Sequence, residues 1–250
     1  DLHTTSAPTK PFIVMNDALN NRQFVRELGY PVIFNIESFI EGSLLNLIND
    51  LGYVSLAFEG GEHYSEDAVV EIEKFLYKTL YFSGAMSIEN ILEMGVSKKI
   101  LRSKSARYFE MIFRQDLQTT DRFEIIGNYT NFQQLKKGEL IAKLNDEKIY
   151  SPKAYQIFMP LYQSKGEDGF FYVKHLSTYK LKVARFFRNL HTENILTLIP
   201  GVQKLNEYTL CLPKPVLKFV PKRFLFAMGY RKSLELDYNN VCYTKQERKM

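Results

Sequence analysis

The fold of this chain is decided by the stretch YVSLAFEGG at residues 53–61. Residues 53–58 are largely apolar, which is typical of a central strand covered on both faces of a sheet. The glutamate that follows, Glu59, is therefore predicted at the carboxyl end of a buried strand, where open α/β sheets place their ligand sites. Gly60 and Gly61 would let the backbone approach a ligand closely. The stretch thus predicts a sheet and a candidate site together.

Apolar strands and amphipathic helices alternate around this stretch. Strands are predicted at residues 12–15 and 31–34, and helices at 43–51 and 66–80. A further helix is predicted to begin after Asp17, which can serve as its N-cap, and to end at a glycine, Gly29. Because strands that alternate with helices form crossover units, this half predicts a largely parallel sheet.

The pattern changes near residues 98–104, which carry four basic side chains. Short strands at regular spacing then predict a small antiparallel barrel or sandwich. The basic remainder predicts a helix at 177–190 and strands at 208–212 and 216–220. We therefore expect an α/β fold with a mixed or parallel sheet, a small β domain and a basic α+β extension, divided at residues 1–98, 99–173 and 174–250.

Composition indicates a packed protein, because 45% of the 250 residues are hydrophobic. No run approaches the roughly 18 apolar residues of a membrane span, and no leader pattern is present. The two cysteines, Cys211 and Cys242, predict reduced thiols in a cytoplasmic protein. Residues 1–16 have the pattern of the middle of a domain, so we expect the natural protein to have a portion before Asp1. A homo-oligomer is compatible with this sequence.

Charge is distributed unevenly along the chain. Residues 174–250 carry 15 Lys and Arg against 5 Asp and Glu, a net charge of +10, whereas residues 1–173 carry −5. Such asymmetry is found in proteins that bind nucleic acid or anionic membranes, and also in basic segments that dock on their own chain.

Within the basic part, cationic and aromatic side chains alternate in a way that suits anionic lipid or single-stranded nucleic acid. Packing of the aromatic rings in the core is the alternative that we favour from the sequence, and no nucleic-acid partner is expected. The residues concerned are Lys214, Lys218, Phe219, Lys222, Arg223, Phe224 and Phe226.

Three residues have the chemistry of a hydrolytic site. Asp1 precedes His3 by two positions, so in an extended segment both side chains point the same way. A metal-binding histidine usually donates its second ring N–H to a carboxylate, a role that Asp1 can fill. A half-buried Glu59 would hold protons more tightly, as a general base that later returns its proton requires. His63 has H-x-x-E spacing to Glu66, but its loop position predicts a residue that lines the site beside Glu59 rather than a metal ligand.

These motifs together resemble the succinylglutamate desuccinylase/aspartoacylase family of the zinc carboxypeptidase clan. The resemblance covers about residues 1–173 and is carried by DLHTT at residues 1–5, by residues 53–61, and by residues 135–142 and 157–160. It implies a partial zinc-carboxypeptidase-like sheet followed by a small β domain near the active site. It also implies that His3 is the last zinc ligand and that Glu59 is the general base for a zinc-activated water. The substrate would be a small N-acyl amino acid or a similar amide.

Departures from the family pattern limit what this chain is expected to do. The family's other two zinc ligands come from a His-x-x-Glu motif that precedes the Asp-Leu-His, and residues 1–250 do not contain it. Residues 47–50 also lack the arginine that aspartoacylases carry before the catalytic glutamate. Since catalytic zinc normally has three protein ligands, we expect this chain alone to bind no stoichiometric zinc and to be inactive.

Two further expectations concern the β domain. Tyr162, Glu167 and Asp168 are candidates for substrate contact, against the alternative of a polar hairpin loop. Residues 137–152 also look like the hammerhead fold of lipoyl and biotinyl carrier domains, which would make Lys148 a modified lysine at a hairpin tip.

Overall fold

The computed structural model describes residues 1–250 except 41, 103–104, 164–165, 191, 234–238 and 247–250. The chain forms two compact units. The first unit comprises residues 1–14, 24–35 and 56–175, and the second comprises residues 15–23, 36–55 and 176–250. The predicted α/β class is confirmed, because the described residues form a mixed sheet with helices and further antiparallel sheets. The sequence-based division at 98/99 and 173/174 stays a prediction.

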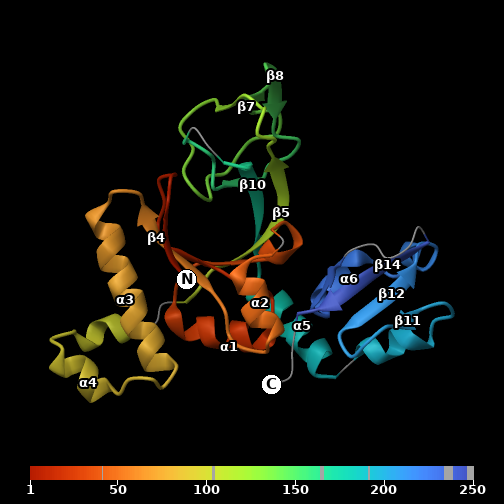
Figure 1. Cartoon of the computed structure of the whole chain (residues 1–250), viewed down its shortest axis with the longest axis horizontal. Coiled ribbons are helices and arrows are strands. Elements are labelled where there is room, and N and C mark those ends of the chain that lie inside the picture. Colours follow the sequence, from red (N-terminus) through yellow and green to blue (C-terminus); the bar gives the residue numbers. More distant parts are fainter. Residues whose placement is uncertain (41, 103–104, 164–165, 191, 234–238, 247–250) are drawn as a thin grey trace. The chain divides into compact units, whose positions relative to one another are not determined.

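The first unit is built on a mixed sheet with the strand order β1-β4-β2-β3-β5-β10-β9. Figure 1 labels β4, β5 and β10 of this sheet. Strand β4 runs parallel to β1 but antiparallel to β2, so the sheet is mixed rather than purely parallel. The strands are β1 Leu2–Thr5, β2 Phe12–Val14, β3 Val32–Phe34, β4 Ala57–Glu62, β5 Tyr108–Asp116, β9 Gln156–Phe158 and β10 Asp168–Leu176.

Helix α3 (Glu66–Phe82) packs against one face of this sheet. Phe58 of β4 stacks on Phe75 of α3 with ring centroids 3.9 Å apart. A Cβ at Gly60 would lie 2.5 Å from Ile72 Cγ1 and 2.8 Å from the Ala68 carbonyl oxygen. The glycine that was predicted to let a ligand approach therefore permits the close approach of α3. The other helices around this sheet are α1 Leu19–Leu28, which runs across both units, α4 Ile88–Glu93 and the 3₁₀ turn η2 Lys98–Leu101.

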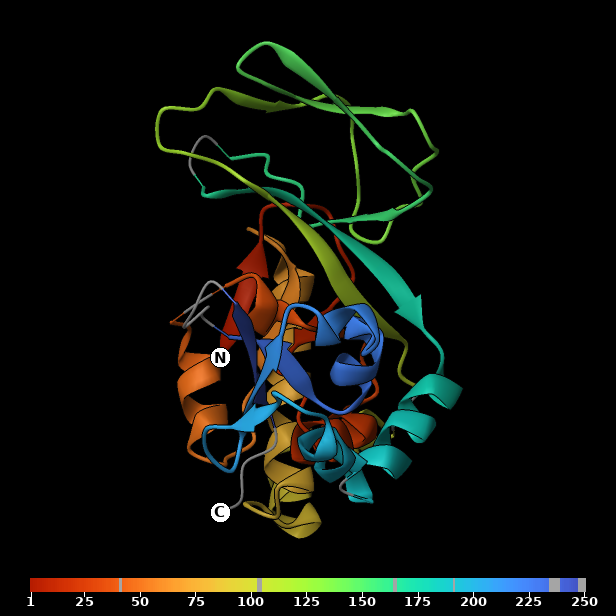
Figure 2. The same ribbon diagram turned by 90° about the vertical axis from the view of Figure 1, so that its right-hand side faces the viewer.

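The small β domain of the first unit continues from the large sheet. Figure 2 shows β5 and β10 as long strands that extend into it. A second, antiparallel sheet with the order β6-β7-β8 completes the domain, with β6 Phe123–Ile125, β7 Leu140–Leu144 and β8 Glu147–Tyr150. Phe12 of the large sheet contacts the rings of Phe132 and Phe158 at 5.8 and 5.0 Å. Phe158 belongs to β9 of the same sheet, and the contact with Phe132 packs the small β domain against one face of the sheet.

Strand β4 differs from its prediction in where it begins. It spans Ala57–Glu62 rather than residues 53–58, so Glu59 lies within the strand and not at its end. The preceding residues are held by polar contacts in the second unit, where Ser55 N–H donates to the Asn21 side-chain oxygen at 3.2 Å and Ser55 Oγ donates to the Leu45 carbonyl. Because the Ser55 N–H bonds to a side chain, it is not available for a β ladder.

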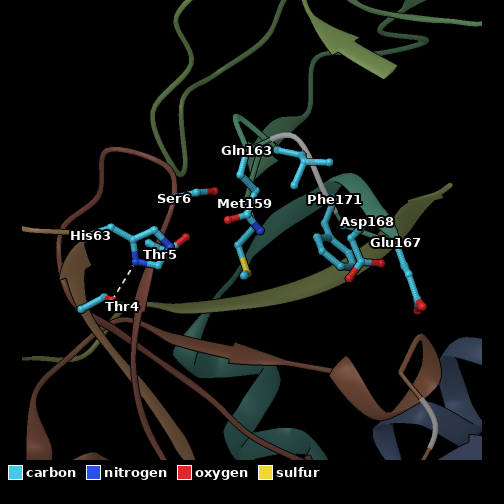
Figure 3. Close-up of a pocket in the computed structure, with 11 residues that line it drawn as sticks. Thr4, Thr5, Ser6, His63, Met159, Gln163, Glu167, Asp168 and Phe171 are labelled. Carbon is cyan, nitrogen blue, oxygen red and sulfur yellow. Dashed lines mark hydrogen bonds between the residues drawn. The ribbon is translucent and has the colours of Figure 1, made fainter. Parts of the chain in front are cut away.

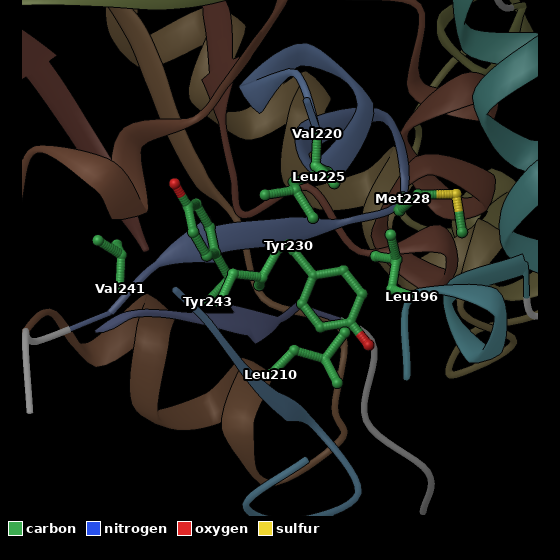
Figure 4. Close-up of a cluster of buried hydrophobic side chains, with 9 residues drawn as sticks. Leu196, Leu210, Val220, Leu225, Met228, Tyr230, Val241 and Tyr243 are labelled. Atoms are coloured by element: carbon green, nitrogen blue, oxygen red, sulfur yellow. The ribbon is translucent and has the colours of Figure 1, made fainter. Parts of the chain in front are cut away.

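The second unit surrounds an antiparallel sheet with the order β11-β12-β14-β13. Figure 4 shows its buried cluster, in which Leu210, Tyr230 and Tyr243 from the sheet meet Val220 and Leu225 from the segment that precedes β13. Its elements are η1 Ile36–Ser38, α2 Leu44–Asp50, α5 Thr178–Asn189, η3 Thr192–Leu198, β11 Gln203–Lys204, β12 Thr209–Pro213, η4 Val216–Lys218, α6 Lys222–Ala227, β13 Tyr230–Lys232 and β14 Asn240–Lys245.

A buried ion cluster ties the segments of the second unit together. Asp17 Oδ2 lies 2.8 Å from Arg188 Nη2 and 2.7 Å from Arg231 Nη2, and Arg22 contacts the other carboxylate oxygen. Burial acts to raise the pKa of Asp17, but the three guanidinium groups outweigh it and hold that pKa well below its ordinary value. The predicted N-cap role of Asp17 is wrong, because helix α1 begins at Leu19 and the carboxylate is turned to these arginines.

Two predictions for the basic part are corrected. Cys211 and Cys242 are not reduced thiols but form a disulfide between β12 and β14, where the two residues are register partners. Residues 216–220 do not form a strand. They contain the 3₁₀ turn η4, flanked by Pro215 and Pro221, which lack the N–H that a ladder needs.

Among the described residues, no helix combines the length and apolar character needed to cross a membrane.

Candidate functional site

His3 and Glu59 lie side by side on neighbouring strands of the first unit. Their Cα atoms are partners in the β1–β4 register, and Glu59 is also the partner of Phe12 in β2. Register partners project from the same face of a sheet. Since Phe12 packs against the Phe132 ring of the small β domain, His3 and Glu59 share the face that this domain adjoins. The two residues that the sequence singled out are thus brought together.

The Glu59 carboxylate is buried, and one of its two oxygen atoms has no hydrogen-bond partner among the described residues. The residue is 9% exposed, and the oxygen concerned is Oε2. Burial raises the pKa of Glu59 above its ordinary value, and the nearby His3 opposes part of that rise. A carboxyl group in this state holds a proton more readily than a solvated glutamate, which is the property that a general base and acid needs.

Asp1 orients the His3 ring. The Asp1 Oδ1 atom lies 2.9 Å from His3 Nε2, as the spacing within the extended segment predicts. This contact leaves Nδ1 as the ring nitrogen available to a ligand. The His3 side chain is 57% exposed, so the ring is accessible from solvent. A histidine whose one nitrogen is bonded to a carboxylate has the arrangement of metal-bound histidines.

A zinc site is not complete within the described residues. Catalytic zinc takes three protein ligands and an open position. Among the described residues, no three His, Cys, Asp or Glu side chains are grouped so that they could hold a metal ion. His3 is therefore one ligand of the predicted set, and the residues present do not fit a catalytic zinc by themselves.

A cavity of about 260 Å³ opens where β1 and β4 end (Figure 3). Thr4, Thr5 and Ser6 line it directly after His3, and His63 lines it after β4. The opposite wall comes from the small β domain, through residues that follow β9 or belong to β10 and the turn before it: Met159, Leu161, Gln163, Gly166, Glu167, Asp168 and Phe171. Such a cavity suits a small polar ligand.

His63 and Glu167 both line this cavity. Thr4 Oγ1 and His63 Nδ1 are 2.8 Å apart, which fixes the histidine ring at the cavity wall (Figure 3). Asp168 is also at the wall, but its carboxylate is paired with Arg114. Carboxylates and hydroxyl groups thus dominate the polar lining among the described residues.

Tyr162 is placed away from the cavity, although its neighbours Leu161 and Gln163 line it. Its hydroxyl group accepts a hydrogen bond from Tyr129 N–H and lies 3.1 Å from the Tyr129 carbonyl oxygen. The Tyr162 hydroxyl therefore links two loops of the small β domain by hydrogen bonds. Substrate contact by Tyr162 remains a prediction, and this geometry does not favour it.

Lys148 does not lie at the tip of a hairpin. The β7–β8 turn is formed by Asn145 and Asp146, both with positive φ, and Lys148 lies inside β8 as the Cα partner of Lys143. A carrier domain presents its modified lysine on the turn, so the geometry offers no support for a lipoyl or biotinyl carrier.

The sequence did not single out the cavity residues as a group. Thr4, Thr5 and Ser6 carried a signal, because they follow His3 immediately and hence lie wherever that strand ends. Met159 lies in the stretch 157–160 that carries the family resemblance, but nothing in the sequence pointed to Gln163, whose place in the cavity depends on how β9 and β10 pair in the large mixed sheet.

Similar solved structures bear the names of the family that the sequence resembles. They include succinylglutamate desuccinylase from Vibrio parahaemolyticus (15% identity, 71% of this chain and 53% of that one, TM-score 0.47). The ectoine utilization protein EutE from Ruegeria pomeroyi is similar at 15% identity over 71% and 59% of the two chains, with a TM-score of 0.48. An aspartoacylase family protein from Mesorhizobium loti follows at 11% identity over 71% and 58%, with a TM-score of 0.41. The chain spans a little over half the length of these structures. The sequence matches no family model and no curated protein.

Proposed function

We propose that this chain is part of an amide-hydrolysing deacylase of the succinylglutamate desuccinylase/aspartoacylase type. The observation that carries the proposal is the juxtaposition of His3 with a buried Glu59 whose Oε2 has no hydrogen-bond partner among the described residues. The resemblance of residues 1–173 to that family supports it. The substrate class is a small N-acyl amino acid or a related amide.

Glu59 performs the proton transfers in this proposal. Its carboxylate takes a proton from the water that attacks the acyl carbonyl, and it returns that proton to the leaving amine nitrogen. The products are a carboxylate and an amine. Neither His3 nor Glu59 lines the cavity formed by residues 4–6, His63 and Glu167, so the proposal assigns that cavity to the part of the substrate beyond the scissile bond. Asp1 keeps the His3 ring oriented.

Zinc enters the proposal through His3, which would supply Nδ1 as one ligand. The described residues do not complete the ligand set, so a catalytic ion would need ligands from the natural protein beyond them. We expect the purified 250-residue chain to hold zinc well below one ion per chain. Near-unit zinc occupancy by elemental analysis would contradict this part of the proposal alone.

The catalytic part is tested by amine release from a panel of N-acyl amino acids. The assay uses the 250-residue chain and, beside it, the chain extended by any natural residues that precede Asp1, each supplied with zinc. Glu59→Gln is expected to lower kcat by about 10²–10⁴ while KM changes little, because it removes proton transfer and leaves the cavity intact. Glu62→Gln, an exposed glutamate at the end of the same strand, is the matched control and should retain activity. No amine release from any substrate, or full activity of Glu59→Gln, would refute the proposal.

A further inference from the structure

The segment between β12 and β13 carries a dense group of cations beside an exposed aromatic ring. We define the basic turn as residues 214–223, which include Lys214, Lys218, Lys222 and Arg223 around Phe219. All four cationic side chains are exposed. No acidic residue occurs between Glu207 and Glu235, so the sequence around the turn offers no carboxylate to neutralise them.

Phe219 is 86% exposed, although it adjoins a buried residue. Its neighbour Val220 points into the core of the second unit with Leu225 (Figure 4). Phe219 N–H and Val220 N–H both donate to the Val216 carbonyl, and Pro221 follows, so the backbone of the turn is fixed. With Val220 anchored inward, the phenyl ring of Phe219 is held outward in water. The sequence-based preference for core packing is therefore wrong for this ring.

The two other aromatic residues of the pattern do pack in the core. Phe224 and Phe226 are partly buried against the same cluster, and the Arg231 guanidinium covers one face of the Phe226 ring at 5.0 Å. Binding of single-stranded nucleic acid uses several free ring faces on which successive bases stack. Of these three rings, Phe219 alone is largely exposed, which disfavours that partner.

We propose that the basic turn docks the second unit on an anionic phospholipid surface, with Phe219 inserted at the level of the headgroups. An exposed aromatic ring surrounded by cations is typical of peripheral membrane-binding sites. In such sites the ring inserts among the lipids while the cations are attracted to anionic headgroups. The charge of the turn complements the surface. None of its four cations forms an ion pair with another described residue, so docking breaks no such pair. This proposal is independent of the hydrolase chemistry, which concerns the first unit.

Because the chain has no tryptophan, Phe219→Trp places a single tryptophan in the basic turn, and its emission can be followed separately from that of the tyrosines. Vesicles of phosphatidylcholine with about 30% phosphatidylglycerol should shift its emission to the blue and carry the chain into the pellet on sedimentation. Raising NaCl from about 0.1 M to about 0.5 M should reverse most of the binding, since exposed charges are screened. Phosphatidylcholine alone should give neither effect.

Matched variants assign the binding to the turn. Lys218→Gln with Lys222→Gln is expected to weaken partitioning roughly 25-fold, about fivefold for each cation. Lys136→Gln with Lys137→Gln removes the same charge from the first unit and should change nothing, as should Tyr64→Ala, which removes a ring that is even more exposed than Phe219. Circular dichroism of each variant checks that it is folded.

Three outcomes would overturn the proposal. These are no blue shift with the anionic vesicles, equal loss of binding in the Lys136 and Lys137 control, or a shift produced by oligo(dT) and not by vesicles. The last result would assign the turn to nucleic acid.

Discussion

Glu59 has a raised pKa because its carboxylate is buried, and this makes the stability of the fold depend on pH. The folded state binds the proton more tightly than the unfolded chain, whose glutamate has its ordinary value of 4.5. The stability that this group contributes is therefore fully present below that pH, and it is lost as pH rises through the folded pKa. Above that pH, the charged carboxylate must be buried at a cost.

We accordingly expect Glu59→Gln to stabilise the 250-residue chain relative to the wild type at pH 7 but not at pH 4. Urea unfolding at a series of pH values measures the difference in unfolding free energy. Glu62→Gln, on an exposed residue of the same strand, should follow the wild-type profile. A difference between Glu59→Gln and wild type that is constant with pH would show that the carboxylate is not desolvated.

The contacts of a site residue could be predicted from the sequence where its partner lies close by in the chain. Asp1 and His3 lie two apart in an extended segment, so their contact follows from strand geometry alone. The pairing of His3 with Glu59 spans more than 50 residues and followed from the family resemblance, not from any local pattern. The ion pairs of Asp17 could not be predicted from local sequence, because its partners Arg188 and Arg231 lie in a distant part of the chain.

At the scale of elements, strand β4 and helix α3 make contact through a position that only glycine fits. The Cβ of an alanine at position 60 would overlap Ile72 and the Ala68 carbonyl. We expect Gly60→Ala to lower the free energy of unfolding by about 1–3 kcal/mol, the usual cost of overpacking. Chemical denaturation of the variant and the wild type gives the value.

Gly138→Ala separates overpacking from backbone strain. Gly138 has a φ of +78° with open space around its Cα, so alanine there costs about 1 kcal/mol through backbone conformation alone. Ile72→Ala should relieve part of the Gly60→Ala cost and none of the Gly138→Ala cost, because it removes the nearest side-chain contact. Additive costs in the Gly60→Ala, Ile72→Ala pair would contradict the contact.

Elements with strong periodicity were predicted well, and elements set by tertiary contacts were not. Helix α3 was predicted from Glu66 onward and observed there. Strand β4 begins four residues later than predicted, because Ser55 bonds to Asn21 and Leu45 instead of a strand. The apolar residues 216–220 suggested a strand, yet two flanking prolines favour a 3₁₀ turn.

At the scale of the whole molecule, the second unit is assembled from three separate stretches of sequence. Composition could not reveal this, because residues 15–23 and 36–55 look like ordinary parts of the α/β half. The buried Asp17 joins the first of these stretches to the last through Arg188 and Arg231. Removing one partner of such a cluster leaves unpaired buried charge, which is strongly destabilising.

Asp17→Asn is therefore expected to cost the second unit about 3–5 kcal/mol. Because the folded pKa of Asp17 is depressed, its stabilising contribution is present above the ordinary value of 3.8 and is lost as pH falls through the folded pKa. The variant should thus differ from wild type most at neutral pH. Urea unfolding followed by circular dichroism at pH 7 measures the cost.

Asp116→Asn supplies the comparison for this prediction. Asp116 also pairs with an arginine, Arg114, but its side chain is mostly exposed, so its loss should cost less than about 1 kcal/mol. Equal costs for the two substitutions would mean that the buried cluster contributes no more than a surface ion pair.

The bond between Cys211 and Cys242 closes a covalent ring that contains the whole basic turn. A protease that attacks the lysines and arginines exposed there would cut the backbone without releasing a fragment. The two pieces would stay tethered and migrate as one species until a reductant separates them. The basic turn can in this way be cleaved without being released from the chain.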